Sequence, residues 1–427
     1  MREMKAFIGL IVLSGSLAFG RSEEWPKWLG PDGTGISTEQ IADRWPRNGP
    51  KKLWEQKVGY GYSSPIGYQG KVYLFSQDGI KDTLTAFDAE NGNVAWSQSY
   101  PVTIAAEAGQ ARNPENPMPL PLATPTIDNG RIYSYGGGGD LVCRKLEDGS
   151  AVWQMNVLKE TGARILTWNE ASSPLVTEKL VYVQGGKNGP TAVAVDKETG
   201  KIVWKSEANT SGGYAAPIIA DVQGTKQIII FGNDTLYGMD PETGKTLWHE
   251  PWRGRVDVNA STPVYHDGHL FVSCDYNKGS LMLSLSPTSA KREWENQRIL
   301  LKFQPAILDN GYLYLNNAGW LECIRWPDGK VMWEAKDRPL HLEQGGSIVR
   351  DADKLITMSE RGKLSLVQAT PQGYKLLSQV QLFDFGTSWS TPLIYHGKLY
   401  AMGRDNLVCL EIANRAAAAA RDPSETR

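Results

Sequence analysis

The residues best suited to bind a ligand stand directly before a short phrase that recurs along the chain, a small or polar residue followed by proline and an apolar strand. They are Tyr62, Trp168, Asn169, Tyr214, Asn259, Gln304, Glu343, Gln344 and Trp389. Their types differ from copy to copy, although their place in the repeat is the same. Ligand sites form where polar groups from several elements converge on a concave surface. The alternative interpretation is that these side chains only hydrogen-bond the backbone and water around a channel.

Short catalytic motifs are missing from the sequence. It has no His-Glu-x-x-His helix, paired Cys-x-x-Cys, Gly-x-Ser-x-Gly elbow, phosphate-binding glycine loop or Cys-x-x-Cys-His haem site. The five histidines do not cluster, and His266 and His396 stand at equivalent hairpin turns, which predicts surface positions. The run Gly136 to Gly139 joins two strands and is interpreted as a turn. On these motifs, we assign no catalytic role to any residue.

The elements that must position the candidate residues belong to a repeat of about 45 residues, a period typical of propellers. The clearest copy begins at Ser173-Pro174, continues through apolar strands at 179–183 and 191–196, turns at Thr199-Gly200 and ends on Trp204. The opening phrase recurs at Ser64-Pro65, Thr124-Pro125, Ser173-Pro174, Ala216-Pro217, Thr262-Pro263, Gln304-Pro305 and Thr391-Pro392, with a weaker version at Gly346-Ser347. Eight copies of four short strands predict eight blades.

Tryptophans mark the last strand of most copies, and their spacing shows how the ring closes. They are Trp96, Trp153, Trp204, Trp248, Trp294 and Trp333. The eighth copy has no closing strand, whereas an unpaired one, Lys52 to Gln56 with Trp54, precedes the first copy. We expect the two ends to pair, because a closed ring hides strand edges. The prediction is an all-β, eight-bladed propeller of four-stranded antiparallel blades, a single domain at 51–412, with the tryptophans filling the gaps between blades.

Charge and targeting signals limit the function classes. The net charge of −2, from 47 acidic and 45 basic residues without a long basic run, argues against a nucleic-acid partner. Residues 1–20 resemble a signal peptide, with Arg2 and Lys5 before an apolar stretch and a small-residue cleavage site at 18–20. The alternative is a membrane anchor, although the apolar run is shorter than the ~20 residues a span needs. We expect a chain exported to the periplasm or the medium, with no transmembrane segment elsewhere.

Three segments lie outside the regular repeat. We expect the lead-in at 21–50, with Trp25 and Trp28, to pack across one face of the ring. The proline-rich interval from Gln98 to Leu122 is predicted to form a loop over a ring mouth, where residues 112–116 could join the site. Residues 413–427, with a run of alanines, are predicted to be a disordered tail.

The four cysteines are predicted to be buried free thiols. Cys143, Cys323 and Cys409 occupy the third strand of blades that are not neighbours, and Cys274 lies on a second strand. Those positions are too far apart for the Cα spacing of a disulfide.

We further expect the protein to be a monomer.

These patterns resemble the pyrroloquinoline-quinone (PQQ) repeat family. The family phrase A-x-D-x-x-T-G-K-x-x-W stands here at Ala194 to Trp204 and, with glycine in first place, at Gly238 to Trp248. The lead-in at 25–33 and the junction Gly61 to Pro65 are similar to a group of secreted bacterial PQQ-binding-like propellers. The resemblance covers nearly the whole mature chain and implies the fold more strongly than the activity, because one fold hosts many functions.

One branch of the family, the quinoprotein alcohol dehydrogenases, implies PQQ and Ca²⁺ in the channel and an aspartate base. In that case Trp168 or Trp389 would stack on the quinone, and Asn169, Asn259 or Glu343 would supply oxygen ligands to Ca²⁺. The chain lacks the adjacent cysteines that such enzymes place over the quinone, lacks a haem motif and is markedly shorter. The resemblance therefore carries no catalytic role onto a numbered residue.

A second branch, the propeller lipoprotein of the outer-membrane barrel-assembly machinery, implies a scaffold without a cofactor. It matches this chain in blade count and size, but the lipid-bearing cysteine is absent here. From the sequence we favour a non-catalytic binding or scaffolding module for a protein, glycan or small ligand. The alternative is a PQQ-dependent alcohol or sugar oxidoreductase with its ligand in the channel mouth.

Overall fold

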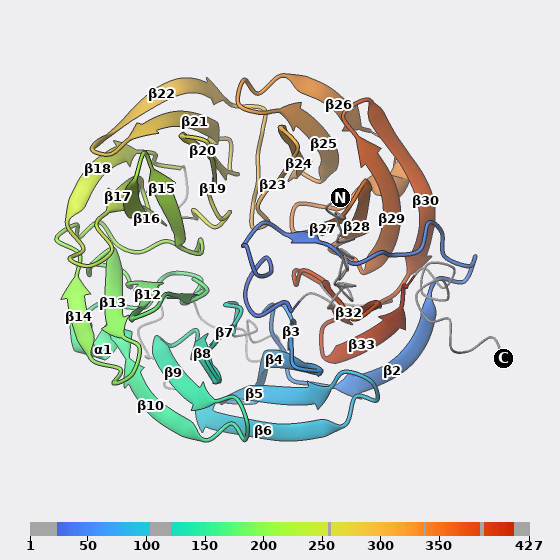
Figure 1. Cartoon of the computed structure of the whole chain (residues 1–427), viewed down its shortest axis with the longest axis horizontal. Coiled ribbons are helices and arrows are strands. Elements are labelled where there is room, and N and C mark those ends of the chain that lie inside the picture. The colour runs from blue at the N-terminus through green and yellow to red at the C-terminus, as the bar shows by residue number, and fades with distance from the viewer. Residues whose placement is uncertain (1–23, 103–120, 255–257, 337, 385–387, 414–427) are drawn as a thin grey trace, which may run out of the picture.

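The computed structural model describes residues 24–102, 121–254, 258–336, 338–384 and 388–413. Within them, eight antiparallel sheets stand around a central axis like the blades of a propeller (Figure 1). Each blade begins with a short strand near the axis and ends with a strand on the outer wall. The predicted all-β, eight-bladed fold is confirmed. The signal peptide expected at 1–20 lies outside the described residues, as does the tail expected at 413–427 except for Ala413, which forms a β-bridge with Ile41.

The first four blades each use four consecutive strands, ordered from the axis outward. Blade 1 contains β3 (Ile66–Tyr68), β4 (Lys71–Asp78), β5 (Lys81–Asp88) and β6 (Val94–Pro101). Blade 2 contains β7 (Thr126–Asp128), β8 (Arg131–Tyr135), β9 (Asp140–Lys145) and β10 (Ala151–Asn156). Blade 3 contains β11 (Leu175–Val176), β12 (Leu180–Gln184), β13 (Ala192–Asp196) and β14 (Ile202–Lys205). Blade 4 contains β15 (Ile218–Val222), β16 (Thr225–Phe231), β17 (Thr235–Met239) and β18 (Thr246–Pro251).

The remaining blades follow the same plan until the ring closes. Blade 5 contains β19 (Val264–His266), β20 (His269–Cys274), β21 (Gly279–Ser286) and β22 (Ser289–Asn296). Blade 6 contains β23 (Ile307–Asp309), β24 (Tyr312–Asn317), β25 (Trp320–Arg325) and β26 (Val331–Ala335). Blade 7 contains β27 (Ser347–Asp351), β28 (Lys354–Met358), β29 (Lys363–Thr370) and β30 (Gly373–Gln381). Blade 8 contains β31 (Leu393–Tyr395), β32 (Lys398–Met402), β33 (Asn406–Glu411) and, from the other end of the chain, β2 (Lys51–Lys57).

Ring closure joins the two ends of the propeller in blade 8. Strand β2 pairs antiparallel with β33, from Lys51 opposite Glu411 to Lys57 opposite Asn406. The predicted exchange of the N-terminal strand into the last blade is therefore confirmed. Blade 7 gains a fifth strand, because β1 (Ile36–Ser37) pairs parallel with its inner strand β27.

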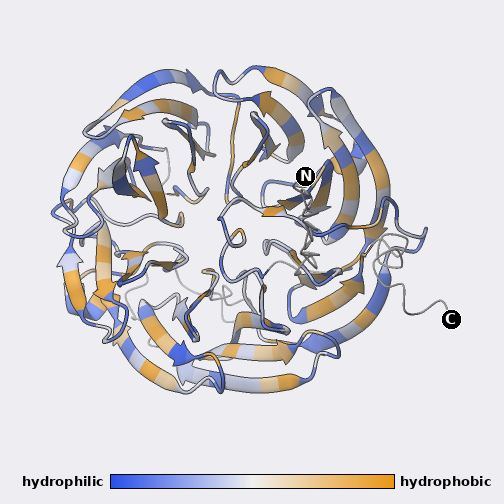
Figure 2. Cartoon of the chain, in the orientation of Figure 1, coloured by the Kyte–Doolittle hydropathy of each residue, from blue (hydrophilic) through white to orange (hydrophobic). Residues whose placement is uncertain are grey.

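Hydrophobic patterning explains why inner and outer strands differ. All five residues of β12 are buried, because this strand packs between neighbouring blades on both faces. On the outer strand β14 the pattern alternates, with Trp204 buried between the exposed residues Val203 and Lys205. Figure 2 shows the resulting mixture of apolar and polar segments along the outer arrows.

Each outer-strand tryptophan seals the gap to the next blade. In blade 3, Trp204 Nε1 donates a hydrogen bond of 2.9 Å to the Pro241 carbonyl of blade 4, and Gly244 lies against the indole. A methyl group on Gly244 would stand 2.5 Å from that ring, so this turn needs glycine for contact as well as for its φ of 71°. The indoles of Trp54, Trp96, Trp153, Trp294 and Trp333 make the equivalent bond.

The contact between blades 4 and 5 uses a bridge instead of a direct bond. Trp248 Nε1 donates to Gln227 Oε1 at 2.7 Å, and Gln227 Nε2 donates to the Pro287 carbonyl of blade 5 at 2.9 Å. The blade 5 turn is degenerate at Thr288-Ser289 and has no glycine there. Gln227 therefore bridges the Trp248 indole to the turn carbonyl. At the other tryptophan contacts the indole donates to the turn carbonyl directly.

The opening phrases form a second set of links close to the axis. Thr391 N donates to Ser64 Oγ at 2.9 Å, Ser64 N to Thr124 Oγ1 at 3.1 Å, and Thr124 N to Ser173 Oγ at 2.9 Å. These bonds connect blades 8, 1, 2 and 3 in order. The serine or threonine before proline therefore serves to link neighbouring blades close to the axis.

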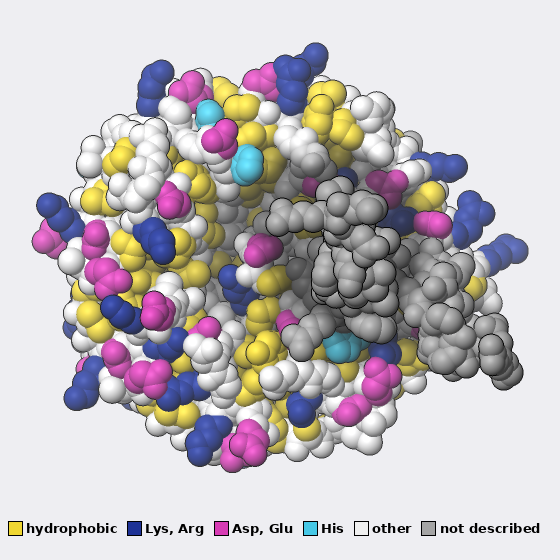
Figure 3. Space-filling model, in the orientation of Figure 1, with side chains coloured by type: hydrophobic (Ala, Val, Ile, Leu, Met, Phe, Trp, Pro, Cys, Tyr) yellow, Lys and Arg dark blue, Asp and Glu magenta, His cyan; other side chains and the backbone are white. Residues whose placement is uncertain are grey.

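The lead-in crosses one face of the ring from the axis to the rim (Figure 1). Trp25 exchanges backbone hydrogen bonds with Gly67 of blade 1, and the Pro26 carbonyl accepts one from Ile127 of blade 2. Ile41 and Trp45 are buried against blades 8 and 7. On the same face, basic and acidic side chains are intermixed around the rim (Figure 3).

Two short helical turns interrupt the sheets, α1 (Val157–Thr161) and the 3-10 helix η1 (Arg338–Leu340). In the part of the chain that the structure describes, no helix is long and apolar enough to cross a bilayer. All four cysteines are buried and free, as predicted. Burial raises the pKa of Cys143 to about 11 and those of Cys274, Cys323 and Cys409 to about 12, so these thiols stay protonated and unreactive at neutral pH.

Candidate functional site

A pocket opens in the central channel, where the segments that lead into the inner strands converge. Its volume is about 240 Å³. The lining consists of Trp28, Tyr62, Leu122, Thr124, Trp168, Ala171, Ser173, Tyr214, Ala216, Val258, Ala260, Thr262, Tyr276, Lys302, Phe303, Gln304 and Trp389, and we call this site the mouth pocket. Most of these residues precede an inner strand, so the ring geometry brings segments from most of its blades to one place.

Trp28 of the lead-in closes the base of the mouth pocket. Its Nε1 donates a hydrogen bond of 3.1 Å to Thr262 Oγ1 before blade 5. A second hollow of about 600 Å³ lies beyond it and shares Trp28, Ser173, Ala216 and Thr262 with the mouth pocket. Residues that line both hollows form the boundary between them. Trp28 therefore stands between the mouth pocket and the second hollow.

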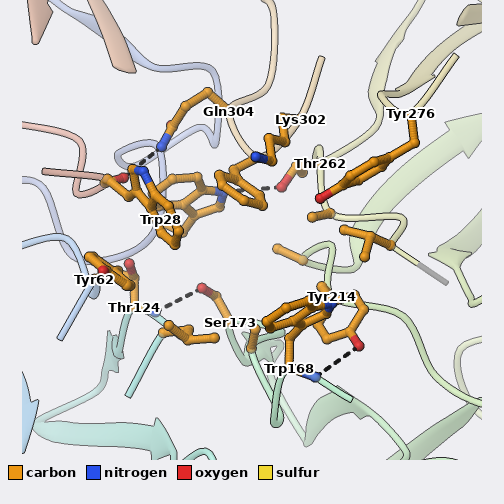
Figure 4. A pocket seen from close by; sticks show the side chains of 17 residues that line it. Trp28, Tyr62, Thr124, Trp168, Ser173, Tyr214, Thr262, Tyr276, Lys302 and Gln304 are labelled. Atoms are coloured by element: carbon orange, nitrogen blue, oxygen red, sulfur yellow. Dashed lines mark hydrogen bonds between the residues drawn. The ribbon is translucent and has the colours of Figure 1, made fainter. Parts of the chain in front are cut away.

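Aromatic side chains form most of the wall. Trp389 packs between Tyr62, with ring centroids 4.3 Å apart, and Phe303, at 4.8 Å. Figure 4 shows Trp168 and Tyr214 on the side of the pocket opposite Trp28. The Trp168 backbone N–H donates to the Tyr214 hydroxyl at 3.3 Å, which fixes the loop that presents the indole. Trp168 is 41% exposed, so a large apolar surface is available to a ligand.

The polar groups at the base of the pocket take part in the links between blades. The hydroxyl oxygens of Thr124, Ser173 and Thr262 each accept a hydrogen bond from an N–H group. Gln304 Nε2 donates to the Trp389 carbonyl at 2.8 Å, and its Oε1 accepts from the Thr391 hydroxyl at 2.8 Å. Each of these oxygens therefore already accepts one hydrogen bond from the protein itself.

Lys302 supplies the only ionised side chain among the described lining residues. Its Nζ lies 5.0 Å from the centroid of Phe303 and 5.8 Å from that of Tyr276, and it donates to Gln344 Oε1 at 3.2 Å. No carboxylate of the described chain pairs with it. A cation placed over aromatic faces is stabilised by their quadrupoles and keeps donors free for a ligand.

The structure brings together five of the nine residues singled out from the sequence. Tyr62, Trp168, Tyr214, Gln304 and Trp389 all line the mouth pocket. Gln344 stands behind the lining, where its side chain accepts the hydrogen bond from Lys302.

The other three candidates are not among the described lining residues of the mouth pocket. The buried Asn259 side chain donates to the carbonyls of Gly232 and Asn233, both at 2.9 Å. Asn169 is buried with a φ of 69°, a left-handed conformation that asparagine tolerates. Glu343 lies 3.5 Å from the His341 ring and 3.8 Å from Arg361. The candidate loop at 112–116 lies outside the described residues.

Sequence reasoning missed four functional side chains of the lining. Lys302 and Phe303 stand two and one residues before Gln304, and Tyr276 lies in the loop between β20 and β21. Loops between second and third strands converge on the same mouth as the opening segments, so this position was a usable signal. Trp28 belongs to the lead-in, where only the structure shows its indole entering the channel.

A separate group of buried carboxylates lies between blades 1 and 2, and we call Asp82 and Asp140 with Gln77 and Tyr100 the carboxylate cluster. Asp82 is fully buried and accepts from Gln77 Nε2 at 3.2 Å and from the Tyr100 hydroxyl at 3.4 Å. Burial raises the pKa of Asp82 to about 7, and the nearby charge of Asp140 adds to this. Burial also raises the pKa of Asp140.

The carboxylate cluster is sealed by the turn at Gly136 to Gly139, which joins β8 and β9 as predicted. A methyl group on Gly136 would stand 2.5 Å from Asp82 Oδ2 and 2.7 Å from the Tyr100 hydroxyl. None of the four cluster residues lines the mouth pocket. Over the described ranges, no group of three or more His, Cys, Asp or Glu side chains is arranged to hold a metal ion.

Comparison with solved structures supports the fold. BamB from Moraxella catarrhalis superposes with a TM-score of 0.61 at 15% identity, covering 85% of this chain and 98% of that one. The quinohemoprotein alcohol dehydrogenase from Comamonas testosteroni superposes with a TM-score of 0.66 at 13% identity, covering 90% and 80%. At such low identity the likeness concerns the fold alone.

Comparison with known sequences gives one curated relative and one family. A quinoprotein ethanol dehydrogenase from Pseudomonas putida is 27% identical over 156 residues, which cover 32% of this chain. The chain covers only 25% of the length of that relative. The family model described as "Outer membrane protein assembly factor BamB" matches residues 46–118 and 107–335. With the eight blades and their repeated T-G-K turns, these matches show that the chain belongs to this family of PQQ-repeat propellers.

Proposed function

We propose that the chain is an exported binding module that holds a small, flat ligand in the mouth pocket without reacting with it. The observation that carries this proposal is the composition of the described lining, which combines an exposed indole and several further aromatic rings with a single cation. Concave, mainly apolar sites with a few placed polar groups are the usual form of small-ligand pockets. The position of Trp28 between the two hollows supports capture of a ligand over passage through the ring.

The described lining does not fit PQQ held with Ca²⁺, the cofactor that the quinoprotein relatives suggest. PQQ carries three carboxylates, and Ca²⁺ takes six to eight oxygen ligands that usually include carboxylates. Lys302 is the one cation in the described lining, and no carboxylate belongs to it. Neither Asn259 nor Glu343, expected as oxygen ligands, belongs to the described lining, although Asn259 Oδ1 and Glu343 Oε2 are buried without a hydrogen-bond partner among the described residues. We therefore assign no oxidoreductase step to these residues.

A protein-docking face is a weaker basis for function in this chain. The most exposed large apolar side chains are spread over separate blades, as with Ile80 on blade 1, Val203 on blade 3 and Val331 on blade 6. Single exposed apolar residues are ordinary on protein surfaces, whereas docking faces are contiguous. The mouth pocket is the more concentrated feature, so the proposal rests on it.

The test is a ligand titration of the purified mature protein, followed by calorimetry and by the thermal midpoint. A ligand at 100 times its Kd raises the free energy of unfolding by about 2.7 kcal/mol, because it binds only the folded state. We expect saturable binding of flat organic ligands that Trp168→Ala weakens and that Val203→Ala, on the outer wall, leaves unchanged. Calcium-dependent binding of PQQ with a Kd below that of every other ligand would contradict the proposal.

A further inference from the structure

The mouth pocket presents an imbalance between hydrogen-bond donors and acceptors that points to one class of ligand. The oxygens of Thr124, Ser173 and Thr262 accept hydrogen bonds from the protein. Among the described residues, these three hydroxyls accept but donate no hydrogen bond. A hydroxyl has one proton to donate besides its acceptor lone pairs. Each of these hydroxyls therefore has one of its two lone pairs in use and keeps its proton for a ligand.

Lys302 makes hydrogen-bond donors outnumber acceptors, because an ammonium donates protons and accepts none. Its ammonium has three protons, and one of them is used by the hydrogen bond to Gln344 Oε1. The ammonium stands over the rings of Phe303 and Tyr276, at the wall of the pocket. A cation that faces a cavity without a carboxylate partner in the described chain is complemented by an anion from outside. Charge-assisted bonds of this kind are about twice as strong as neutral ones.

The shape of the apolar lining selects the rest of the ligand. Trp168 is presented on one side of the pocket and Trp28 on the opposite side (Figure 4), while Trp389 is held in place between Tyr62 and Phe303. Aromatic side chains pair with other flat rings in offset or edge-to-face geometry. Sugars are less suitable, because their many hydroxyls need acceptors as well as donors, and Gln304 is already paired at both ends.

We propose that the mouth pocket binds a planar aromatic carboxylate, with its ring between the indoles of Trp28 and Trp168 and its carboxylate on Lys302. This inference rests on the proposed function and names the ligand class for the same site. One carboxylate is balanced by one ammonium, and the remaining oxygen lone pairs face the hydroxyl protons at the base. The three negative charges of PQQ exceed what the described lining can neutralise.

The experiment is isothermal titration calorimetry of the full mature protein with four probes. These are 2-naphthoate, the uncharged isostere 2-naphthamide, the non-aromatic acid cyclohexanecarboxylate and methyl β-glucoside. We expect 2-naphthoate to bind roughly 10- to 100-fold more tightly than 2-naphthamide, the effect of one hydrogen-bonded charge. Cyclohexanecarboxylate is expected to bind more weakly than 2-naphthoate because it lacks a flat ring.

Variants assign the preference to one side chain. Lys302→Gln should abolish the difference between the acid and the amide, whereas Lys302→Arg should keep it. Lys278→Gln is the matched control, because the Lys278 ammonium stacks 3.6 Å from the centroid of Trp252, outside the pocket lining. Circular dichroism and the thermal midpoint confirm that each variant is folded before it is titrated.

The outcomes separate this inference from the function on which it rests. Equal binding of the acid and the amide, unchanged in Lys302→Gln, would overturn the anion specificity while leaving a ligand-binding pocket. Tightest binding of cyclohexanecarboxylate or of the glucoside would overturn the aromatic specificity. Failure of all four probes to bind would count against the proposed function and the inference together.

Discussion

The mouth pocket and the carboxylate cluster each contain one of the two features that an acid–base active site must combine. The mouth pocket has space, about 240 Å³, and a lining whose described residues include no carboxylate. The carboxylate cluster has two acids with raised pKa values but is closed by the turn at Gly136. Perturbed pKa values are common at active sites, yet here they arise from burial between two blades. The difference favours binding over proton transfer.

The comparison also shows how one repeat produces two kinds of environment. Residues before the inner strands face the channel, so aromatic side chains such as Tyr62 and Trp168 remain accessible at the mouth. The start of β5, in contrast, lies against the neighbouring blade, and Asp82 is fully buried there. The predictions below alter one region at a time, beginning with the largest expected effect.

The largest effect is expected from Asp82→Asn, as a change in stability with pH. The folded pKa of about 7 lies above the ordinary value of 3.8, so the folded state binds this proton more tightly than the unfolded state. The native protein should therefore lose stability as pH rises from about 4 to 7. At pH 8 Asp82→Asn should be more stable than the native protein by at most about 4 kcal/mol, at 1.36 kcal/mol per pKa unit.

Chemical denaturation at pH 4 and pH 8 measures this difference. At pH 4 the gain should vanish, because Asp82 is then protonated in the native protein. Asp148→Asn is the control, since Asp148 is exposed and hydrogen bonds within its own turn lower its pKa. A gain of equal size at both pH values would show that packing, and not charge burial, distinguishes the variant. Ligand affinity at the mouth pocket should not change.

A smaller effect on stability is expected from Trp28→Ala, which removes the base of the mouth pocket. Buried tryptophan-to-alanine changes cost about 3–5 kcal/mol, and the half-buried Trp28 should cost about 2 kcal/mol. The mouth pocket would then open into the lower hollow, so ligand affinity should fall as well. Trp28→Phe keeps the plug and loses only the bond to Thr262, so it should retain most of the affinity. Calorimetry and denaturation together separate the two effects.

The fold could be predicted almost completely from the sequence because its signals repeat. The glycine-containing turns and the outer tryptophans specify the same contact at most blade boundaries, as at Trp204 and Gly244. Even the degenerate turn at Thr288-Ser289 left the blade count unchanged, because Trp248 and Gln227 replaced the missing contact. Because the same sequence pattern recurs in most blades, one degenerate copy does not obscure the fold.

The site could be predicted only in part, because its chemistry belongs to single residues. Position in the repeat identified Tyr62 and Trp168, since every opening segment reaches the channel mouth. It could not show that Asn259 turns toward the carbonyls of blade 4, because asparagine serves a ligand or a backbone equally well. Nor could it place Trp28, whose entry into the channel depends on the path of the lead-in across the ring.

A change confined to binding is expected from Trp168→Ala. The indole is 41% exposed, so its loss should change the free energy of unfolding by less than about 0.5 kcal/mol, as at other surface positions. Affinity for a flat ligand should fall about tenfold, corresponding to one lost aromatic contact of about 1.4 kcal/mol. Calorimetry compares this variant with Val203→Ala, whose exposed side chain lies far from the lining. Unchanged affinity would remove Trp168 from the binding surface.

The smallest effect concerns the coupling between Asp82 and Asp140. The charge of Asp140 raises the pKa of Asp82, so Asp140→Asn should lower that pKa and shift the pH-dependent loss of stability toward lower pH. At pH 8, Asp82→Asn and Asp140→Asn each relieve the same repulsion. The double variant should therefore gain less than the sum of the single variants, by about 0.5–1 kcal/mol.

The pH dependence of this double-variant cycle tests whether the coupling is electrostatic. At pH 4 Asp82 is neutral in the folded state, so the coupling between the two positions should disappear. A coupling that persists at pH 4 would instead reflect packing around Gly136, against which the Asp82 carboxylate and the Tyr100 hydroxyl lie. In that case the cluster would act as a rigid polar joint between blades 1 and 2, insensitive to pH. Vanishing coupling would show that the blade contact carries a repulsion that the mouth pocket, with its single cation, does not share.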